Sequence, residues 1–414
     1  MAFWLVTSLF VLTYLGMALG RLPGLRVDRS WLAGAAAVLL LFSGAVTPQQ
    51  AASHLDAGAL LLLLGLMLIS AQFDFSGVYA WLNQRLSHWA DRPALLLLGV
   101  VLLSGLLSAI LVNDIVAFAL TPLLCHSLLA RQLDPRPFLL ALALAANAGS
   151  SASLIGNPQN ILLGQAGNLD FWGYMAVAAV PALAALVISY GVIYWQWHKR
   201  WGVAQPVPPA DEGAPAQQVY GARSYLKPLL ASAVLLMLFS SSLPREFSAL
   251  AVAAALMISR RFASRDYVQQ VDWNLLLLFA GLFIVTGAAV ELPQITALAQ
   301  QLSEAGWLPE GLWSLTGVAL VGGNLIGNVP LVILLLGVLP EASQGLLISL
   351  AILSTLAGNL LIIGSVVNLI VAESAQRQGV QLGFMDFARS GLPVTLLSLA
   401  VAVAWLGLGG WLPW

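Results

Sequence analysis

The chain has 414 residues, of which 60% are hydrophobic and only 8% are charged, and its formal net charge is −1. This composition argues against a soluble globular domain, and no basic run indicates nucleic-acid binding. The single cysteine, Cys125, excludes an intrachain disulfide and a thiolate metal cluster, and the four histidines match no metal-ligand spacing. Apolar runs of about 20 residues recur along the chain, and a run of that length crosses a bilayer as a helix. We therefore predict a protein of the lipid bilayer that has no cofactor.

The first half opens with an apolar stretch that lacks a preceding basic segment and a small-residue cleavage site, so we expect a retained span rather than a signal peptide. A polar, amphipathic stretch ending at Arg92 precedes a hairpin of two apolar limbs over 94–130, with Asn113 and Asp114 at its tip. The predicted spans of this half are 3–20, 31–46, 57–75, a broken span at 138–166 interrupted between Gly149 and Pro158, and 171–197.

Residues 198–225 are rich in proline, alanine and polar residues, so we expect a flexible cytoplasmic linker there. The second half repeats the pattern, with a hairpin over 311–339 that has Asn328 at its tip. Its predicted spans are 226–243, 247–259, 272–290, a broken span at 345–372, and 391–412.

The offsets between matching residues are steady: 272 − 56 = 216 for two aspartates before leucine runs, 328 − 113 = 215 for the tip asparagines, and 368 − 160 = 208 for asparagines of the broken spans. They predict a duplicated unit, with a first repeat at 1–197, the linker at 198–225 and a second repeat at 226–414. The expected fold class is an all-α polytopic membrane protein. Its two inverted-topology repeats each have five transmembrane spans, one of them broken, plus one re-entrant hairpin.

Charge predicts the orientation, because Lys and Arg accumulate in cytoplasmic loops. With the 21–30 loop inside, 16 of the 17 Lys and Arg residues face the cytoplasm, and Arg245 is the exception. Both termini then lie outside. The hairpin limb 329–339 spans about 16 Å as a helix at 1.5 Å per residue, which is too short to cross, so we favour re-entrant hairpins.

The break in the first broken span has the residues that such an interruption needs. Gly156 lets the chain leave the helix, and Pro158 suits the first turn of the restarting helix. That helix points free backbone amides and a positive dipole end at the break, which suits an anionic ligand group. Hydroxyls, amides and freed carbonyls add hard oxygen ligands for a cation such as sodium, and the residues that supply or support them are Asn147, Gly149, Ser150, Ser151, Asn157 and Asn160.

The second half offers a matching set, with tip residues Gly327 and Asn328 and break residues Gly358, Asn359, Gly364, Ser365 and Asn368. A carboxamide can give its oxygen to a cation or its N–H to a carboxylate. We therefore expect Asn113, Asn160, Asn328 and Asn368 to line one central cavity and to hold any bound sodium. Interrupted helices at corresponding places of two halves are typical of the binding site of a secondary transporter. The alternative is that these Asn and Gly residues mediate helix packing.

Asp114 is the only carboxylate at any of the four interruptions, and an ionisable group at membrane depth is a functional candidate. It would carry a proton or bind a cation; the alternatives are a solvated tip or an N-cap on the second limb. No Lys or Arg lies in a predicted span or break. An anion would therefore depend on helix dipoles, amides and co-bound cations, and a neutral substrate is equally compatible.

At these tips and breaks the chain resembles the ion transporter superfamily, which includes divalent anion/sodium symporters, citrate carriers, arsenite permeases and a sodium/proton antiporter family. Within it the chain is most similar to bacterial inner-membrane anion transporters of the arsenite-permease type, over nearly its whole length outside 198–225. The resemblance implies a small inorganic or carboxylate anion as substrate and a homodimer. In the symporters each hairpin tip carries Ser-Asn-Thr; here Val112, Asp114, Gly327 and Val329 replace the hydroxyl residues.

We expect a secondary active transporter of a small anion or oxyanion in the bacterial inner membrane, coupled to sodium or protons and working by alternating access. The alternatives are a cation/proton antiporter and an efflux permease for neutral arsenite. A membrane enzyme would need paired carboxylates, H-E-x-x-H or a Ser–His pair, and the sequence has none of these, so we expect no enzyme. The sequence leaves open the substrate, the coupling ion, the direction of transport and the oligomeric state.

Overall fold

The computed structural model of the protein describes residues 2–19, 28–202, 222–258, 262–305, 308–309, 311–339 and 342–414. Across these ranges the regular structure is helical, apart from one isolated β-bridge between Leu133 and Gly202. Most of the predicted linker at 198–225 lies outside the described residues, and a helix already begins at Ala222. The protein is an all-α, multi-pass membrane protein, as its composition predicts.

The helices of the first half follow the predicted spans closely. They are α1 (Ala2–Leu19), α2 (Arg29–Phe42), α3 (Pro48–His54), α4 (Ala57–Phe75), α5 (Val78–Ser87), α6 (Pro93–Ile110), α7 (Asn113–Leu129), α8 (Arg136–Ser150), α9 (Pro158–Ala166) and α10 (Phe171–Trp197). The helices α6 and α7 form the first hairpin. The helices α8 and α9 are the two parts of the first broken span.

The described helices of the second half repeat this order. They are α11 (Ala222–Leu238), α12 (Arg245–Met257), α13 (Ser264–Gln269), α14 (Trp273–Val290), α15 (Pro293–Glu304), α16 (Leu312–Ile326), α17 (Asn328–Val338), α18 (Gln344–Ala357), the 3₁₀ turn η1 (Ile362–Gly364), α19 (Val366–Arg377) and α20 (Phe384–Leu408). Among the described residues, α4, α6, α10, α14 and α20 are at least 18 residues long and apolar enough to cross a membrane.

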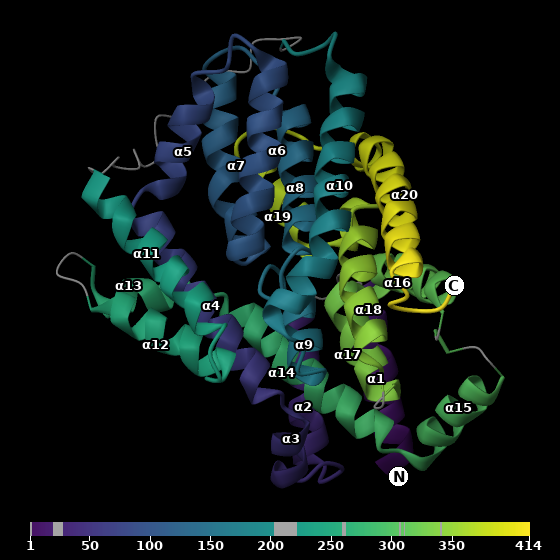
Figure 1. The fold of residues 1–414 in the computed structure, drawn as a ribbon. Helices are drawn as coiled ribbons and strands as arrows, with labels where there is room; N and C mark the ends of the chain where they lie inside the picture. The colour runs from purple at the N-terminus through teal and green to yellow at the C-terminus, as the bar shows by residue number, and fades with distance from the viewer. Residues whose placement is uncertain are drawn as a thin grey trace.

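Each first-half helix has a counterpart ten labels later, including the short helices that no predicted span covered. The starts of α3 and α13 differ by 264 − 48 = 216 residues, and those of α5 and α15 by 293 − 78 = 215. These short helices were missed because they are too short and too polar to stand out as spans. Figure 1 shows α5 and α15 on opposite flanks of the molecule, as expected when the second unit is inverted.

The packing of the helices also relates each half to the other: a helix pair in one half recurs with the two counterparts exchanged. The helix α2 packs on α14, while its counterpart α12 packs on α4, the counterpart of α14. In the same way α7 packs on α19, and α17 on α9. The last helix of each half, α10 or α20, packs on the other. Two copies of one unit interlocked about a two-fold axis give this pattern, so the chain contains the two inverted repeats that the offsets predict.

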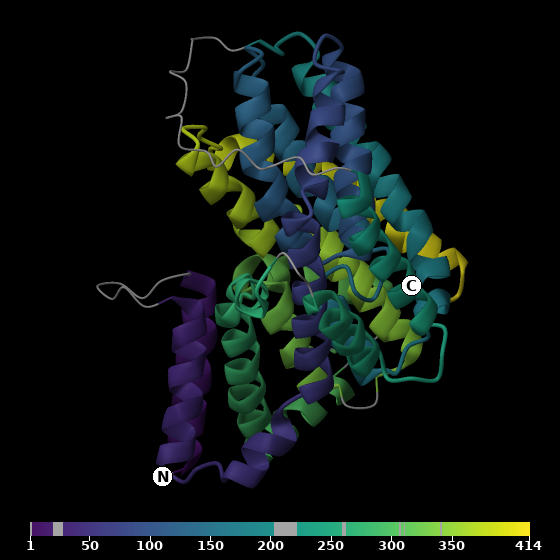
Figure 2. The ribbon, with the colours of Figure 1, turned by 90° about the vertical axis from the view of Figure 1, so that its left-hand side faces the viewer.

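Apart from the short helices α5 and α15, the described helices fall into two groups, which we call the frame (α1–α4 and α11–α14) and the core (α6–α10 and α16–α20). Within the frame α1 packs beside both α2 and α14, and Figure 2 shows it at the edge of the molecule with the N-terminus at its lower end. Contacts between the groups run from α1 to α16, from α4 to α9 and from α14 to α17. The frame also contacts the first hairpin, through α4 and α7, so it lies directly against both hairpins and the first broken span.

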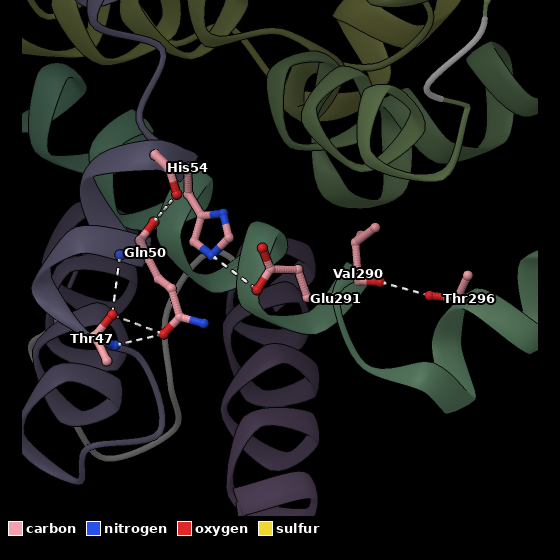
Figure 3. Close-up of polar contacts among 7 residues, drawn as sticks. Thr47, Gln50, His54, Val290, Glu291 and Thr296 are labelled. Carbon is pink, nitrogen blue, oxygen red and sulfur yellow. Dashed lines mark hydrogen bonds and ion pairs between the residues drawn. The ribbon is translucent and has the colours of Figure 1, made fainter.

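The short helix α3 ties the two halves together at one end of the frame. It begins with a capping box, in which the Gln50 N–H donates to Thr47 Oγ1 at 3.2 Å and the Thr47 N–H donates to Gln50 Oε1 at 2.9 Å. At its other end His54 Nε2 lies 3.8 Å from Glu291 Oε2, which follows α14 (Figure 3). A Cβ atom on Gly287 would lie 2.5 Å from the His54 ring, so the missing side chain permits this close approach.

The last helix, α20, corrects one predicted boundary. It begins at Phe384, whereas the sequence predicts a start at 391. The prediction starts too late because the first two turns of α20 carry the polar residues Asp386, Arg389 and Ser390. An interfacial helix turn does not need to be apolar, so hydropathy detects only the part of α20 that crosses the hydrocarbon. Large apolar side chains such as Phe42, Trp195 and Leu408 are exposed on α2, α10 and α20, as expected where helices face lipid.

Candidate functional site

The tip of the first hairpin docks into the first break. The helix α6 ends at Ile110 and α7 begins at Asn113, whose backbone N–H donates to the Gly156 carbonyl at 2.9 Å. The Asn113 side-chain amide donates to Asn147 Oδ1 at 3.3 Å and to Ser150 Oγ at 3.2 Å. Asn113 is buried, so these bonds hold the tip in one position at the break.

The tip of the second hairpin is a single glycine. Gly327 has φ +96° and ψ 152°, a conformation that residues with a Cβ rarely adopt, and α17 begins at the next residue, Asn328. Four residues before Asn328, the amide of Asn324 donates to the Ala357 carbonyl at 2.9 Å. This hairpin therefore docks at the end of α18 and near the second break.

Each break is braced by one asparagine from the restarting helix. Asn160 Nδ2 donates to the carbonyls of Ser150 at 3.3 Å and Ser153 at 2.9 Å. Asn368 Nδ2 donates to the carbonyls of Gly358 at 2.9 Å and Leu361 at 3.1 Å. All three positions are related by one offset, since 368 − 160, 358 − 150 and 361 − 153 each equal 208. The same two bonds thus satisfy the carbonyls freed by each break.

We call Asn160 and Asn368 the brace residues. Two further side chains connect the brace residue of one half to the other half. Asn147 of α8 donates to Asn368 Oδ1 at 3.1 Å and to Asn359 Oδ1 at 2.9 Å. Thr355 of α18 donates in turn to Asn160 Oδ1 at 3.3 Å. Each half therefore supplies one residue that holds the brace of the other half, and the two breaks form one connected polar network.

Other predicted residues support this network. Ser365 Oγ donates to Asn147 Oδ1 at 3.0 Å, and the Asn157 amide donates to Ser150 Oγ at 2.9 Å. The Ser151 carbonyl accepts from the Tyr174 hydroxyl at 2.8 Å. Gly149 lies where α8 crosses α6, and a Cβ there would lie 2.1 Å from the Gly105 carbonyl oxygen. These positions therefore fix the shape of the breaks through packing and hydrogen bonds.

A cavity of about 80 Å³ lies between the frame and these interruptions. The predicted residues that line it are Asn113, Asp114, Gly327, Asn328, Gly364 and Ser365. Asn160 and Asn368 do not line it, and their side-chain atoms bond within the network instead. Sodium binding by all four asparagines stays a prediction, and the cavity wall supports it best for Asn113 and Asn328.

Four helices begin at the wall of this cavity. The helices α7, α9, α17 and α19 start at Asn113, Pro158, Asn328 and Val366, and all four residues line it. Helix N-termini present free N–H groups and a positive dipole end, which favour an anion. In addition, Asn113 Oδ1 and Asn328 Oδ1 are buried and have no hydrogen-bond partner among the described residues. Unpartnered amide oxygens are hard ligands suited to a cation.

Asp114 lines the cavity from the first turn of α7. The N-cap position of α7 is occupied by Val112, with no side-chain cap bond, so Asp114 does not serve as the N-cap. Among the described residues, no recorded hydrogen bond or ion pair engages its half-buried carboxylate. Its carboxylate is therefore available to a proton or a cation.

A family model described as "Citrate transporter" matches residues 9–346, which is most of the chain. The chain belongs to this family of transporters. Relatives include the arsB transporter of Dictyostelium discoideum (24% identity, covering 89% of this chain and 85% of the relative) and the silicon efflux transporter LSI3 of Oryza sativa (24%, covering 93% of each). An uncharacterized transporter of Mycobacterium tuberculosis is 27% identical and covers 97% of each chain.

The fold is similar to that of a solved structure, the YdaH transporter of Alcanivorax borkumensis, which has an unusual topology. The TM-score is 0.57 at 17% identity, and the alignment covers 98% of this chain and 96% of the other. The resemblance to the ion transporter superfamily and the predicted fold class are thus confirmed, and the chain is a transporter of the multi-pass membrane type.

Sequence reasoning missed two polar residues of the cavity wall. Gln159 lies beside the first break, and Arg29 comes from the frame as the first residue of α2. The sequence places Arg29 in a loop outside every predicted span and break, so its guanidinium group does not count there among the groups that could bind an anion. Packing of the frame against the hairpins brings the start of α2 to the cavity, and no spacing in the sequence signals that contact.

Proposed function

We propose that the protein is a secondary active transporter for a small anion or oxyanion, coupled to a cation, in the bacterial inner membrane. The observation that carries this proposal is the convergence of four helix N-termini on one cavity that also contains Arg29 and two unpartnered amide oxygens. The helix ends and the guanidinium group favour the anion. The oxygens of Asn113 and Asn328 favour a bound sodium ion, which would also compensate the charge of the anion.

The size of the cavity favours a small substrate. Its volume of about 80 Å³ is well below the roughly 300–1,000 Å³ of pockets that enclose larger organic ligands. Sulfate, phosphate and arsenite are therefore better candidates than citrate in this conformation. Arg29 is the first residue of α2, at the end of this helix that the charge pattern assigns to the cytoplasmic side, which supports a cavity nearer that side of the frame.

Alternating access would follow from the two groups of helices. The core contains both hairpins and both broken spans, and it contacts the frame through a limited set of helix pairs. Movement of the core against the frame would expose the cavity first to one side and then to the other, as in other carriers built from inverted repeats.

A second candidate is efflux of a neutral metalloid hydroxide, such as arsenous or silicic acid, in exchange for protons. The observation that favours it is Asp114, a carboxylate without a recorded partner on the cavity wall and without an acidic counterpart at the second tip, where Val329 stands. The name of the LSI3 relative, a silicon efflux transporter, agrees with such a substrate. A neutral hydroxide needs no counter-ion, so a proton on Asp114 would suffice for coupling.

The test is ligand stabilisation of the purified protein by sulfate, phosphate, arsenite, silicic acid and citrate, each with and without sodium. A ligand that binds the folded state raises the unfolding temperature by mass action. We expect one small solute to stabilise the protein, and sodium to strengthen the effect for an anion. The variant Asn328→Ala should lose the sodium dependence, while Gln376→Ala on the exposed side of α19 should keep it. Stabilisation by citrate alone would contradict the small-substrate assignment.

A further inference from the structure

We call the cavity between the frame and the four interruptions the transport cavity. A second cavity, of about 650 Å³, lies away from it and shares no lining residue with it. We call it the basic cavity. It is formed where α8 begins, α10 ends and α20 begins. Figure 1 shows the end of α10 and the start of α20 toward the upper end of the molecule, while α9 lies toward the other end. The basic cavity therefore belongs to the region that the charge pattern assigns to the cytoplasmic surface.

Positive charge exceeds negative charge around this cavity. Its wall contains four basic residues (Arg136, Lys199, Arg200 and Arg389) and two acidic ones (Asp134 and Asp386). Asp134 is already neutralised, since Arg136 Nη2 lies 2.6 Å from its Oδ2 and Arg136 Nε bonds both carboxylate oxygens at 3.0 Å. Three cations then remain against Asp386. Among the described residues no carboxylate lies within ion-pair distance of any of the three.

The basic groups are held by a built framework. The Trp197 indole has the guanidinium groups of Arg136 and Arg200 over its ring, at 5.3 Å and 5.7 Å from the centroid. The backbone N–H of Asp134 donates to the Trp201 carbonyl at 2.8 Å. The chain that leaves α10 is therefore fastened to the start of α8, which fixes the position of Arg200 relative to Arg136.

The start of α20, which forms the third side of the basic cavity, is also held by hydrogen bonds to α10. Ser390 Oγ donates to Gln196 Oε1 at 2.6 Å, and Gln196 Nε2 donates to the Arg389 carbonyl at 2.9 Å. One glutamine thus joins the end of α10 to the start of α20. The backbones that carry Lys199 and Arg389 are therefore held at a defined separation before any ligand binds, which lowers the ordering cost of binding.

We propose that the basic cavity binds a phosphate group, carried either by an anionic phospholipid or by a soluble phosphate ester. Arg and Lys clusters bind phosphate through charge-assisted hydrogen bonds, and Arg does so with two parallel bonds. Basic pockets between membrane helices on the cytoplasmic side are typical sites for phospholipid headgroups. Large apolar side chains are exposed beside the cavity, Trp195 near the end of α10 and Phe384 at the start of α20. Aromatic residues gather at the membrane–water interface, so the cavity lies at headgroup level, which favours the lipid.

The experiment uses the full-length protein, purified in a neutral detergent and stripped of lipid. The unfolding temperature is measured with added phosphatidylglycerol, with phosphatidylcholine, and with glycerol 3-phosphate or inorganic phosphate. The double variant Lys199→Gln/Arg389→Gln removes two of the uncompensated charges. The matched control is Arg131→Gln, an exposed arginine in the α7–α8 connection that does not line the cavity.

We expect phosphatidylglycerol, but not phosphatidylcholine, to raise the unfolding temperature of the wild type and of the Arg131 variant. The double variant should need at least tenfold more lipid for the same rise, because the loss of even one charge-assisted bond has about that effect. A rise with glycerol 3-phosphate or phosphate and none with phosphatidylglycerol would assign the site to a soluble ester. Equal stabilisation by both lipids, no response to any probe, or an unchanged response of the double variant would overturn the proposal, as would an equal loss in the Arg131 variant.

Discussion

Asp114 and Arg29 give the transport cavity one group of each charge, from the core and from the frame respectively. The two groups form no ion pair with each other or with another described residue, so neither neutralises the charge of the other. An unpaired carboxylate at membrane depth is costly unless it is protonated or neutralised by a cation. Its protonation or cation occupancy is therefore expected to change together with binding of the substrate.

The first prediction concerns Asp114→Asn. The variant keeps the shape of the tip but cannot bind a proton or compensate a cation. In proteoliposomes we expect solute flux driven by a sodium or pH gradient to fall to the level without a gradient, while exchange of substrate persists. The control is Asp91→Asn, an exposed carboxylate in the connection before α6. Wild-type gradient dependence in the Asp114 variant would show that this carboxylate has no part in coupling.

The second prediction separates an anionic from a neutral substrate through Arg29→Gln. A hydrogen bond to a charged group contributes about 2 kcal/mol, so an anion should bind roughly thirtyfold more weakly to this variant. A neutral hydroxide should bind almost as well as to the wild type. The dissociation constant from isothermal titration is the measurement, and Arg92→Gln at the exposed start of α6 is the control.

At the scale of elements, the two broken spans are stabilised by the same device, an asparagine that donates to two carbonyls across the break. The two hairpins differ more. The first tip bonds its break through the backbone N–H and the side-chain amide of Asn113. The second turns at Gly327, and its Asn328 Oδ1 has no hydrogen-bond partner among the described residues. The breaks therefore supply rigidity, and the tips supply the Asp114 carboxylate and the two amide oxygens that line the cavity without a hydrogen-bond partner among the described residues.

The third prediction follows from the braces. In Asn160→Ala the Ser153 carbonyl loses its donor, and in Asn368→Ala the Gly358 carbonyl does, at a cost of about 1–3 kcal/mol for an unsatisfied buried group. We expect either variant to unfold at a clearly lower temperature, whether or not ligand is present. Gln376→Ala, on the exposed face of the same helix as Asn368, should leave the unfolding temperature unchanged. Unaltered stability in both brace variants would mean that the bonds across the breaks contribute nothing.

At the scale of the whole molecule, the exchanged packing of α2 with α14 and α12 with α4 follows from inversion of the second repeat. Inversion needs an odd number of crossings in the first repeat, and the charge pattern then puts both termini outside the cytoplasm. The orientation itself stays a prediction.

The fourth prediction tests this orientation by cysteine labelling. Cys125 is buried and should give little background with an impermeant thiol reagent. We expect Pro413→Cys, at an exposed position, to be labelled on intact cells, and Ala210→Cys to be labelled only after the membrane is opened. The reverse pattern would show that the termini face the cytoplasm.

Much of the fold could be predicted from the sequence because the bilayer imposes simple rules on it. The helices α4 and α10 match their predicted spans at both ends, since apolar length is what the membrane selects. The short helices α3, α5, α13 and α15 and the start of α20 were missed, because interfacial turns carry no hydropathy signal.

The sequence by itself determined the spans, the duplication and the four interruptions, because each depends on local composition or on a repeated spacing. The tertiary structure decided what the interruption residues do. It placed Asn160 and Asn368 in braces rather than on the cavity wall, and it brought Arg29 to that wall from a different group of helices. A side chain's partners depend on which helices pack together, and packing between distant segments leaves no periodic trace in a single sequence.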